Sequence, residues 1–568
     1  MTSEYVLGIN GWFEGSHDAS AVLVEFREKA SPRIIAGIEE DKVIGKKGLY
    51  DIFPARAVEE VLKIGNISPR ELSCILIGWD YPLVYKKNEK IFNKNSIDIL
   101  KQLFPNEAVD LPIQFVNHHL SHANSSHFCS KKRKSLSLVI DGSGELESTS
   151  LWLFDGQFGK CIETFSPISS FGFLFEATNI MMGFRENESG KTMGLSGYGE
   201  PVYLDSLLKY FDECLSPSNK LIKIYERMDK TFNKKLLLPY QEVCIRTWLY
   251  IFKYILKVNQ STQKYKSFYE IPSDLKNLAA SVQALLEIKI IDYITKKTSE
   301  FKIHDVTISG GVALNCILNG KILNLDTVES IFVQPSSGDS GVSLGAALEY
   351  GKQRGYSVYI DDFSPYIGKE IPDDVVENYL KQHQIVYQYV SDASSDIALL
   401  LKMNKTVALF QGRNEWGPRA LGNRTILSLA KEGKLDFINE FVKCRELGRP
   451  LAPSLLIDDY DKLLPSLPKK FGKYMNIAYT ARKEISSDFS SVIHIDSTFR
   501  PQFVSEEDNS TYFKQLKTIK DLVGSSIVIN TSFNEETPII YSLEQVISFW
   551  QKRNIDAIVL NNKFILKR

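Results

Sequence analysis

The sequence predicts an α/β protein with more than one domain. A strand-forming run at residues 5–10 leads through a polar turn into two further runs, at 19–25 and 33–39, which is the pattern of a β-meander. Two later strands, at 306–308 and 331–333, each end in a glycine-rich turn that opens a helix. The chain has 568 residues, enough for two or three domains with separate cores.

A second αβ pattern follows a polar stretch, residues 351–372, which is typical of a linker. A helix is predicted over 373–383 and a strand over 406–410. We therefore expect two domains, residues 1–358 and 359–568.

Composition narrows the class of protein. The net charge of −1 provides no basic field for nucleic acid or a membrane surface, so neither is expected as a partner. Seven scattered cysteines without a Cys-x-x-Cys pair argue against a disulfide framework and a thiolate zinc site. The N-terminus lacks the pattern of a signal peptide, and no apolar run is long enough to span a bilayer. A cytoplasmic protein is predicted, with a homodimer as the candidate assembly.

The polar turn after the first strand carries His17 and Asp18. Side chains at the end of a strand can reach a ligand. The alternative is an aspartate that stabilises the turn beside an uninvolved histidine.

Four of the eight histidines fall within residues 118–127. If this stretch is helical, His118 and His122 are four residues apart and project from one face. Two imidazoles and a carboxylate from elsewhere can hold a metal ion. The alternative is a polar turn in which the histidines only form hydrogen bonds. Because there is no His-Glu-x-x-His motif, the helix lacks the built-in base of a zinc protease.

Glycine-rich segments follow several predicted strands. The strand at 135–140 ends in Asp141-Gly142-Ser143-Gly144-Glu145, where amides can approach a phosphate and the aspartate can hold a metal or orient a hydroxyl. The same motif also occurs in simple hairpin turns. Residues 188–199 gather glycines around Glu188 and Lys191, which predicts a functional loop and not a packed element.

Two successive strand–turn–helix units, with turns at 309–315 and 335–341, would direct two helix N-termini at one ligand. That arrangement suits a nucleotide, although neither turn is a Walker loop or a Gly-x-Gly-x-x-Gly motif. Asp339 in the second turn is a candidate third metal ligand. Two histidines and one carboxylate form the facial set that favours Fe(II).

The second half of the chain is rich in arginine at constrained positions. Arg413, Arg419 and Arg424 lie among glycines after the strand at 406–410, and guanidinium groups there can bind phosphate or carboxylate. We expect a second anion site, to which further residues could contribute: Lys443, Arg445, Arg449, His494, Arg500 and Asn530.

Nine motifs, in this order, resemble those of the NodU/CmcH family of O-carbamoyltransferases over nearly the whole chain. The first combines Asn10–Trp12 with His17–Ser20. The others begin at Asn117, Asp141, Lys191, Ser309 and Gly338, continue in Gly412–Arg424, and end in His494–Gln502 and Asn530–Asn534. The resemblance implies an N-terminal actin/hexokinase-like (TsaD-like) domain that binds ATP and a metal, and a C-terminal YrdC-like α/β domain.

The same resemblance implies an activity. Carbamoyl phosphate and ATP would form carbamoyladenylate in the C-terminal domain, and a small-molecule hydroxyl or amine would then accept the carbamoyl group in the N-terminal domain. The expected cofactors are a divalent metal, with Fe(II) favoured, and Mg²⁺ with ATP as cosubstrate.

Site residues follow by matching this sequence to the motifs. His17 and Lys47 are expected to be catalytic, and the metal ligands are His118, His122 and Asp339, with His119 set aside. The expected nucleotide contacts are Asp141, Gly142, Lys191, Gly310, Gly311, Asn315 and Gly338. The expected carbamoyl-phosphate contacts are Arg413, Arg419, Arg424, Lys443, Arg449, His494, Arg500 and Asn530.

Two other functions fit parts of the sequence. An ATP-dependent kinase of the actin/hexokinase class explains the first half but leaves the arginine-rich half without a role. A non-catalytic nucleotide-dependent or RNA-binding protein is disfavoured by the neutral charge and by the clustered histidines.

Overall fold

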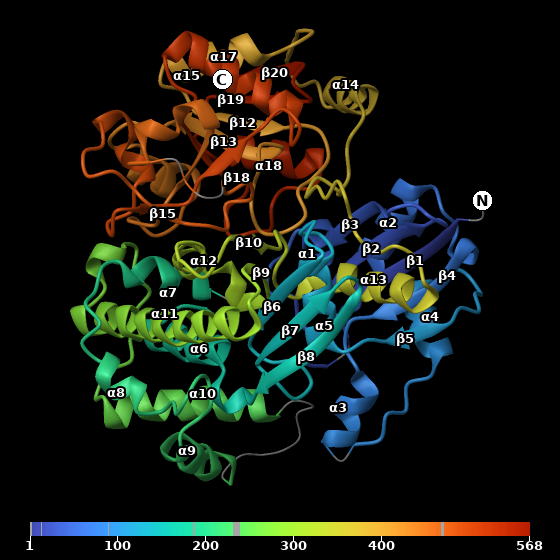
Figure 1. The fold of residues 1–568 in the computed structure, drawn as a ribbon. Coiled ribbons are helices and arrows are strands. Elements are labelled where there is room, and N and C mark those ends of the chain that lie inside the picture. The colour runs from blue at the N-terminus through green and yellow to red at the C-terminus, as the bar shows by residue number, and fades with distance from the viewer. Residues whose placement is uncertain are drawn as a thin grey trace. The chain divides into compact units, whose positions relative to one another are not determined.

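The computed structural model describes residues 3–12, 14–88, 90–185, 188–230, 239–466, 468 and 471–568. It divides into two compact units (Figure 1). The N-terminal unit comprises Met1–Ile44, Gly48–Lys264 and Ile271–Phe363. The C-terminal unit comprises Gly45–Lys47, Tyr265–Glu270 and Ser364–Arg568.

The first sheet of the N-terminal unit has the strand order β3-β2-β1-β4-β5. Its strands are β1 (Glu4–Asn10), β2 (Ser20–Phe26), β3 (Arg33–Glu39), β4 (Leu72–Ile77) and β5 (Ile113–Phe115). The first three strands are antiparallel, with Val6 opposite Val24, so the predicted meander is confirmed. β4 and β5 then extend the sheet in parallel.

The second sheet repeats this plan in the order β10-β9-β6-β7-β8. Its strands are β6 (Lys134–Ile140), β7 (Thr149–Asp155), β8 (Phe158–Phe165), β9 (Asp305–Ser309) and β10 (Ser330–Val333). β6, β7 and β8 are antiparallel, and β9 and β10 extend the sheet in parallel. Each sheet is thus a meander followed by two parallel strands, the second of which lies at the edge.

Two helices pack against the sheets of this unit: α5 (His118–His127) and α13 (Val342–Arg354). α13 packs on β1 and β2, α5 packs on β6 and β9, and the helices pack on each other. They approach closely because Gly345 has no side chain, since a Cβ there would lie 1.7 Å from the carbonyl oxygen of Ser121. This packing fixes the position of the histidine-bearing helix.

A helical insertion separates β8 from β9. It contains α6 (Phe171–Met182), α7 (Ser189–Ser196), α8 (Leu204–Leu208), α9 (Asn219–Asp229), α10 (Pro239–Tyr250) and α11 (Ser273–Phe301). The long helix α11 runs beside α6, α7 and α8 (Figure 1). Within residues 201–275 the insertion contains α8, α9 and α10, and residues 231–238 lie outside the described part.

The prediction of a loop over residues 188–199 is wrong, because most of this stretch forms α7. Thr192 and Leu195 are fully buried, and the helix packs on α6 and α11. At its end, a Cβ on Gly199 would lie 2.2 Å from the carbonyl oxygen of Lys276 on α11. The glycines of this stretch therefore include one that allows close packing, which sequence reasoning took for loop flexibility.

Shorter elements complete the N-terminal unit. They are α1 (Glu40–Ile44), α2 (Ala55–Gly65), α3 (Tyr81–Lys87), α4 (Ser96–Leu103) and α12 (Cys316–Leu323). α2 covers β2 and β3. Its apolar side chains lie on one face of the helix, and Ala57, Val58, Val61 and Leu62 are all buried.

The C-terminal unit is built on an eight-stranded mixed sheet in the order β11-β20-β19-β12-β13-β18-β14-β17. Its strands are β11 (Gln388–Tyr389), β12 (Val407–Phe410), β13 (Arg424–Leu429), β14 (Ala452–Leu456), β17 (Gln502–Val504), β18 (Val528–Ser532), β19 (Ala557–Leu560) and β20 (Phe564–Lys567). β15 (Tyr479–Thr480) and β16 (Thr498–Phe499) form a separate pair.

The helices of this unit are α14 (Asp373–Gln382), α15 (Ser394–Lys402), α16 (Lys434–Phe437), α17 (Ser510–Val523) and α18 (Leu543–Lys552). α15 and α17 pack together, and their buried side chains, including Ile397 and Leu516, join Val407 and Val559 of the sheet in one core. The predicted α/β class is confirmed in both units.

Two further features bear on the sequence predictions. Among the described residues, no helix combines the length and apolarity needed to cross a membrane. The seven cysteines are free thiols in the structure.

Candidate functional site

Two histidines and two aspartates face one another in the N-terminal unit: His118, His122, Asp141 and Asp339. One ligand atom from each lies within 4.8 Å of the others, and all four residues are buried. The Nε2 atoms of His118 and His122 are 3.2 and 3.5 Å from Oδ2 of Asp141. They are 3.5 and 3.6 Å from Oδ1 of Asp339.

These separations fit a shared metal ion. Ligand atoms about 2.1 Å from a metal lie about 3.0–3.4 Å apart at octahedral or tetrahedral angles. Both ring nitrogens of His122 are buried without a hydrogen-bond partner in the structure. Because a buried polar group without a partner is costly, an ion between the four side chains would satisfy this ring. The donor set of two nitrogens and two oxygens suits a divalent transition metal.

The surrounding backbone orients the ligands. Nδ1 of His118 lies 3.1 Å from the carbonyl oxygen of Gly78, to which it donates, so Nε2 carries the lone pair that faces the aspartates. The amide of Gly311 donates to Oδ1 of Asp141 at 3.0 Å, which turns Oδ2 toward the histidines. Burial would raise the pKa of Asp141, but His118 and His122 lower it well below its usual range.

Sequence reasoning placed Asp141 among the nucleotide contacts, whereas the structure groups its carboxylate with the metal-type cluster. The position of Asp141 follows from sheet topology. β6 and β9 are parallel neighbours, so the turn after β6 and the turn after β9 meet at one edge. His119, which lies between the two clustered histidines in sequence, points away and contacts Ser150 Oγ at 2.8 Å through Nδ1.

His17 lies beside this cluster. Asn10 donates to the carbonyl oxygens of His17 and Asp18, which shapes the turn after β1. Nδ1 of His17 faces Asp18 Oδ2 at 3.2 Å, and Nε2 lies 3.9 Å from Asp339 Oδ2. Burial would lower the pKa of His17, but Asp339 and Asp18 raise it to about 10. The ring retains partial exposure, so its Nε2 edge can meet a ligand that approaches the cluster.

The glycine turns have the backbone geometry that sequence reasoning expected. Gly310 has φ of +93°, and a Cβ there would lie 2.2 Å from the carbonyl oxygen of Ile140. Gly338 has no crowded neighbour in its Cβ direction. Gly142 is covered by Phe173, and its carbonyl accepts from Ser170 Oγ at 2.7 Å. These turns leave backbone amides close to the four-residue cluster.

Two other predicted nucleotide residues have side chains with structural contacts. Asn315 accepts from the amide of Leu318 and exchanges hydrogen bonds with Gln283 on α11. Lys191 forms an ion pair with Glu188 at 2.8 Å and lies over the ring of Phe184. The structure thus gives both side chains protein partners, and their nucleotide roles stay predictions.

In the C-terminal unit, five cations form a cluster that includes a buried lysine: Lys443 with Lys47, Arg445, Arg449 and Arg500. Nζ of Lys443 donates to Ser532 and Asn534, whose backbone and side-chain oxygens lie 2.5–3.2 Å away. Burial, and then the charges of Arg445, Lys47 and Arg449, lower the pKa of Lys443 well below its usual value. Burial and then the charge of Arg449 also lower the pKa of Arg445 well below its usual value.

Lys443 is buried, whereas Arg449 and Arg500 are half-buried and Lys47 is exposed. Cations that repel one another around a buried lysine are typical of an anion site. Lys47, which is predicted from the sequence to be catalytic with His17, lies near enough to Lys443 for its charge to lower the pKa of that lysine. Arg445 was noted in the sequence but not selected, and its signal was its position between Lys443 and Arg449.

The three arginines of the glycine-rich stretch do not share one role. Arg424 is fully buried, and its two terminal nitrogens donate to the carbonyls of four residues: Lys369, Gln411, Gly412 and Asn423. It also stacks on Phe410, with Cζ 3.9 Å from the ring centroid. Arg413 donates to the carbonyls of Gly368 and Ile367. Arg419 is half-buried. Arg424 thus meets carbonyl oxygens where an anion was expected.

Asn530 and His494 also have protein partners. Asn530 donates to Ser454 Oγ and Gln502 Oε1, and it accepts from Thr425. Nδ1 of His494 lies 3.1 Å from Asp496 Oδ1. Both side chains therefore take part in hydrogen bonds or ion pairs within the protein. Direct contacts of Asn530 and His494 with carbamoyl phosphate stay predictions.

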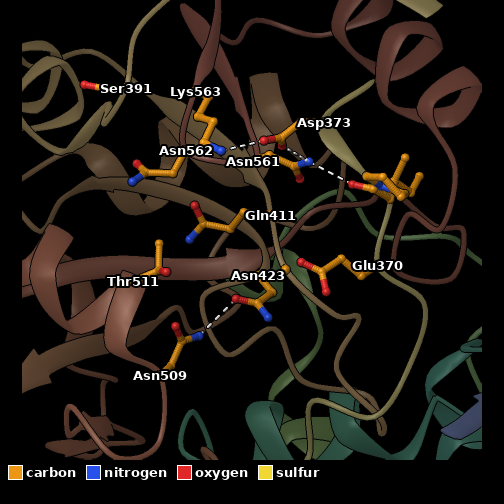
Figure 2. A pocket seen from close by; sticks show the side chains of 13 residues that line it. Glu370, Asp373, Ser391, Gln411, Asn423, Asn509, Thr511, Asn561, Asn562 and Lys563 are labelled. Carbon is orange, nitrogen blue, oxygen red and sulfur yellow. Dashed lines mark hydrogen bonds and ion pairs between the residues drawn. The ribbon is translucent and has the colours of Figure 1, made fainter. Parts of the chain in front are cut away.

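A polar cavity of about 470 Å³ opens at the ends of β12 and β19. Figure 2 shows Gln411, Asn423 and Asn509 on one side and Asp373 with Lys563 on the other. Asn509 donates to Asn423, Asn561 donates to Asp373, and Lys563 pairs with Asp373. The side-chain amides of Asn509 and Asn561 in the cavity lining therefore already have protein partners. The five cations described above are not among the residues that line it.

Comparison with known proteins identifies the family. The family model described as carbamoyltransferase N-terminus matches residues 85–348, and the carbamoyltransferase C-terminus model matches residues 398–567. Nodulation protein NolNO of Sinorhizobium fredii is 31% identical over 574 residues, which cover 97% of this chain and 79% of that protein. The chain belongs to the carbamoyltransferase family. The resemblance seen in the motifs is confirmed, and the protein is a carbamoyltransferase.

Other carbamoyltransferase relatives match over shorter regions. The 3'-hydroxymethylcephem-O-carbamoyltransferase of Streptomyces clavuligerus is 29% identical over 257 residues, 45% of this chain and 47% of that protein. Among solved structures, HypF of T. kodakarensis matches with a TM-score of 0.31 and 14% identity, over 62% of this chain and 48% of that chain.

Proposed function

We propose that this carbamoyltransferase is ATP-dependent and works in two steps. In the first, carbamoyl phosphate, ATP and water give carbamoyladenylate, phosphate and pyrophosphate. In the second, an acceptor hydroxyl or amine attacks the carbamoyl carbon, and AMP leaves. The observation that carries the proposal is the presence, in a member of this family, of two chemically different sites: a buried cation cluster in one unit and a His/Asp cluster in the other.

The cation cluster suits the first step. Carbamoyl phosphate is a small anion, and the buried charges of Lys443 and Arg445 with Arg449 can offset its phosphate charge. Lys443 is also held in place by Ser532 and Asn534, so it is ordered before the substrate arrives. Burial keeps water away from the reactive carbamoyl group. We assign contacts with carbamoyl phosphate also to Arg413, Arg419, His494, Arg500 and Asn530. Arg424, which was predicted with them, would instead hold the surrounding backbone through its four carbonyl partners.

The His/Asp cluster suits the second step. His118, His122, Asp141 and Asp339 would hold a divalent metal, for which the nitrogen and carboxylate donors favour Fe(II). When bound, the metal supplies positive charge near the adenylate phosphate. The turns at Gly310, Gly311 and Gly338 would lie beside the same phosphate. The amides of Gly310 and Gly311 donate to Ser337 and Asp141, so among the three glycines the amide of Gly338 would be the one offered to the phosphate.

His17 would take the proton of the acceptor. Its Nδ1 faces Asp18, so its Nε2 is the atom that can accept a proton beside the cluster. The raised pKa of His17 depends on the charge of Asp339, and a cation bound by Asp339 offsets that charge. His17 then titrates nearer to its ordinary range and can act as a base.

The acceptor is proposed only as a class. The name of the Streptomyces clavuligerus relative specifies a hydroxymethyl oxygen as its acceptor. We therefore expect a hydroxyl group of a sugar, an antibiotic or another natural product, with an amine as the alternative. Residues 201–275 of the helical insertion include α10, which lies beside the Asp141 turn, where Tyr240 donates to the carbonyl of Gly144 and Gln241 to Ser143.

The test is an incubation of the protein with carbamoyl phosphate, ATP and a panel of sugars, aminoglycosides and macrolides. Phosphate and pyrophosphate release that requires carbamoyl phosphate, together with a carbamoylated acceptor in mass spectra, would support the proposal. A phosphorylated acceptor and ADP, formed without carbamoyl phosphate, would instead indicate a kinase. Carbamoyl transfer that proceeds without ATP would exclude the adenylate step.

A further inference from the structure

A buried glutamate, Glu145, connects the segments that carry two of the four clustered ligands. It lies four residues after Asp141 and is 2% exposed. Its Oε1 accepts from the amide of Asp80 at 2.7 Å and from the amide of His118 at 2.9 Å. Its Oε2 accepts from Nδ2 of Asn117 at 2.7 Å. One carboxylate thus joins the turn before α3, the start of α5 and the turn after β6.

These contacts fix His118 from both ends. Its backbone amide is bound by Glu145, and its ring Nδ1 donates to Gly78, two residues before Asp80. Because Glu145 also binds Asp80, the backbone and the ring of His118 are both held to the same short turn. The ring centroids of Trp79 and His118 are 4.0 Å apart, so the indole packs directly against the imidazole.

The same carboxylate restrains the distance between His118 and Asp141. Asp141 and Glu145 belong to one short turn. Within it, the amide of Asp141 donates to the carbonyl of Ser148, and the amide of Gly144 donates to the carbonyl of Glu147. A shift of this turn would move Asp141 relative to α5, and their 3.2 Å approach would change. When ionised, Glu145 also places negative charge at the N-terminus of α5, where the helix dipole favours an anion, although burial raises its pKa to about 7.

We propose that Glu145 is a positioning residue for metal binding: it holds His118 and the Asp141 turn in the geometry that a metal ion needs. This inference rests on the proposed metal site. Groups outside the ligand set that orient the ligands commonly change metal affinity by about 10- to 100-fold. Glu145 contacts the ligand residue His118 at the backbone amide of His118, so a substitution of Glu145 removes none of the four ligand side chains.

The structure offers a matched control. Glu40 is also a buried carboxylate, 3% exposed, and it also accepts from backbone amides near a helix start, at Ala57 and Arg56 of α2. Its carboxylate bonds to residues of α2 and to none of the four clustered residues. Glu40→Gln and Glu145→Gln therefore make the same chemical change, and only the second is expected to affect the metal site.

The test measures the affinity of the full-length, chelator-treated protein for Fe(II) under anaerobic conditions, with Co(II) as a spectroscopic substitute. We expect Glu145→Gln to weaken metal binding by about 10- to 100-fold. Glu40→Gln should lower thermal stability but keep the wild-type metal Kd. Equal metal affinity in wild type and Glu145→Gln would overturn the positioning role, and so would an equal loss in both variants.

Failure of the metal site itself gives a different result, because the wild type would then bind neither ion. If Glu145→Gln does not fold, Asn117→Ser provides a second variant. Serine can still cap α5 in place of the Asn117 side chain, which accepts from Leu120, but it lacks the amide that donates to Glu145. A weaker but measurable loss of metal affinity is expected, and an unchanged Kd would overturn the inference.

Discussion

Nε2 of His118 lies 3.2 Å from Oδ2 of Asp141, and both side chains are buried. The two come from different elements, α5 and the turn after β6, so the contact is a product of the tertiary fold. Asp339 completes the arrangement from the turn after β10. The protein therefore concentrates two carboxylates and two imidazoles where no solvent can screen them, and a cation is the simplest way to stabilise this charge.

Asp141→Asn is expected to remove metal binding, because the amide loses the negative charge that faces both histidines. The loss should exceed the roughly 100-fold effect that a group outside the ligand set can produce. Metal analysis of the purified protein and titration with Fe(II) or Co(II) measure it. Asp155→Asn is the control, since Asp155 is exposed and forms an ion pair with Lys134. Retention of one metal per chain in Asp141→Asn would contradict the ligand assignment.

Metal removal is expected to lower the melting temperature. A ligand that binds only the folded state stabilises it by about 2.7 kcal/mol when its free concentration is 100 times its Kd. Chelator-treated protein should therefore melt earlier, and Fe(II) should restore the original Tm. In Asp141→Asn, addition of the same ion should change Tm little. An identical Tm with and without metal in the wild type would count against a site inside the fold.

His17→Asn is expected to separate the two proposed steps. Without the imidazole, the acceptor loses its base, and carbamoyl transfer should fall by about 10²- to 10⁴-fold. Release of pyrophosphate that depends on carbamoyl phosphate should continue, because it takes place with groups of the other unit. His304→Asn is the control, since His304 is exposed and contacts the carbonyl of Thr327. Full transfer activity in His17→Asn would remove His17 from the mechanism.

Arg449→Gln is expected to raise the KM for carbamoyl phosphate by about tenfold, which corresponds to one charge-assisted hydrogen bond. Arg449 is half-buried and pairs with Glu446, so the substitution should cost little stability. Arg482→Gln is a matched control, because Arg482 is exposed and donates to the carbonyl of Asp461. The measurement is the rate of pyrophosphate release against carbamoyl phosphate concentration. Equal KM values for both variants would exclude a direct role for Arg449.

Some features of the site were readable in the sequence. The spacing of His118 and His122 predicts one helix face, and α5 confirms that both lie on a helix. Asp339 could be chosen because it lies in a glycine turn at a helix start. Asp141 could not be assigned to the same cluster, because its position depends on the parallel pairing of β6 with β9, whose strands are separated by more than 160 residues. A single sequence carries no signal for that register.

Other features depend on where a polar group points. Arg424 lies two residues after Gly422 and Arg449 directly follows Gly448, and the sequence assigns them one role. The structure gives Arg424 four carbonyl partners and gives Arg449 the carboxylate of Glu446. Similarly, Gly199 is needed for close packing on α11, which sequence reasoning cannot distinguish from a glycine in a loop.

Arg424→Lys is expected to unfold the C-terminal unit more readily, although it keeps the charge. Lysine has one ammonium group and cannot bridge the carbonyls of Lys369, Gln411, Gly412 and Asn423 that the planar guanidinium reaches. Buried carbonyls left without donors should cost about 3 kcal/mol of unfolding free energy. Arg413→Lys, which disturbs only the two carbonyls of Ile367 and Gly368, should cost about half as much. Urea unfolding of both variants measures the difference. If Arg424→Lys were as stable as the wild type but failed to use carbamoyl phosphate, Arg424 would belong to the anion site after all, and the carbonyl contacts would not explain its burial.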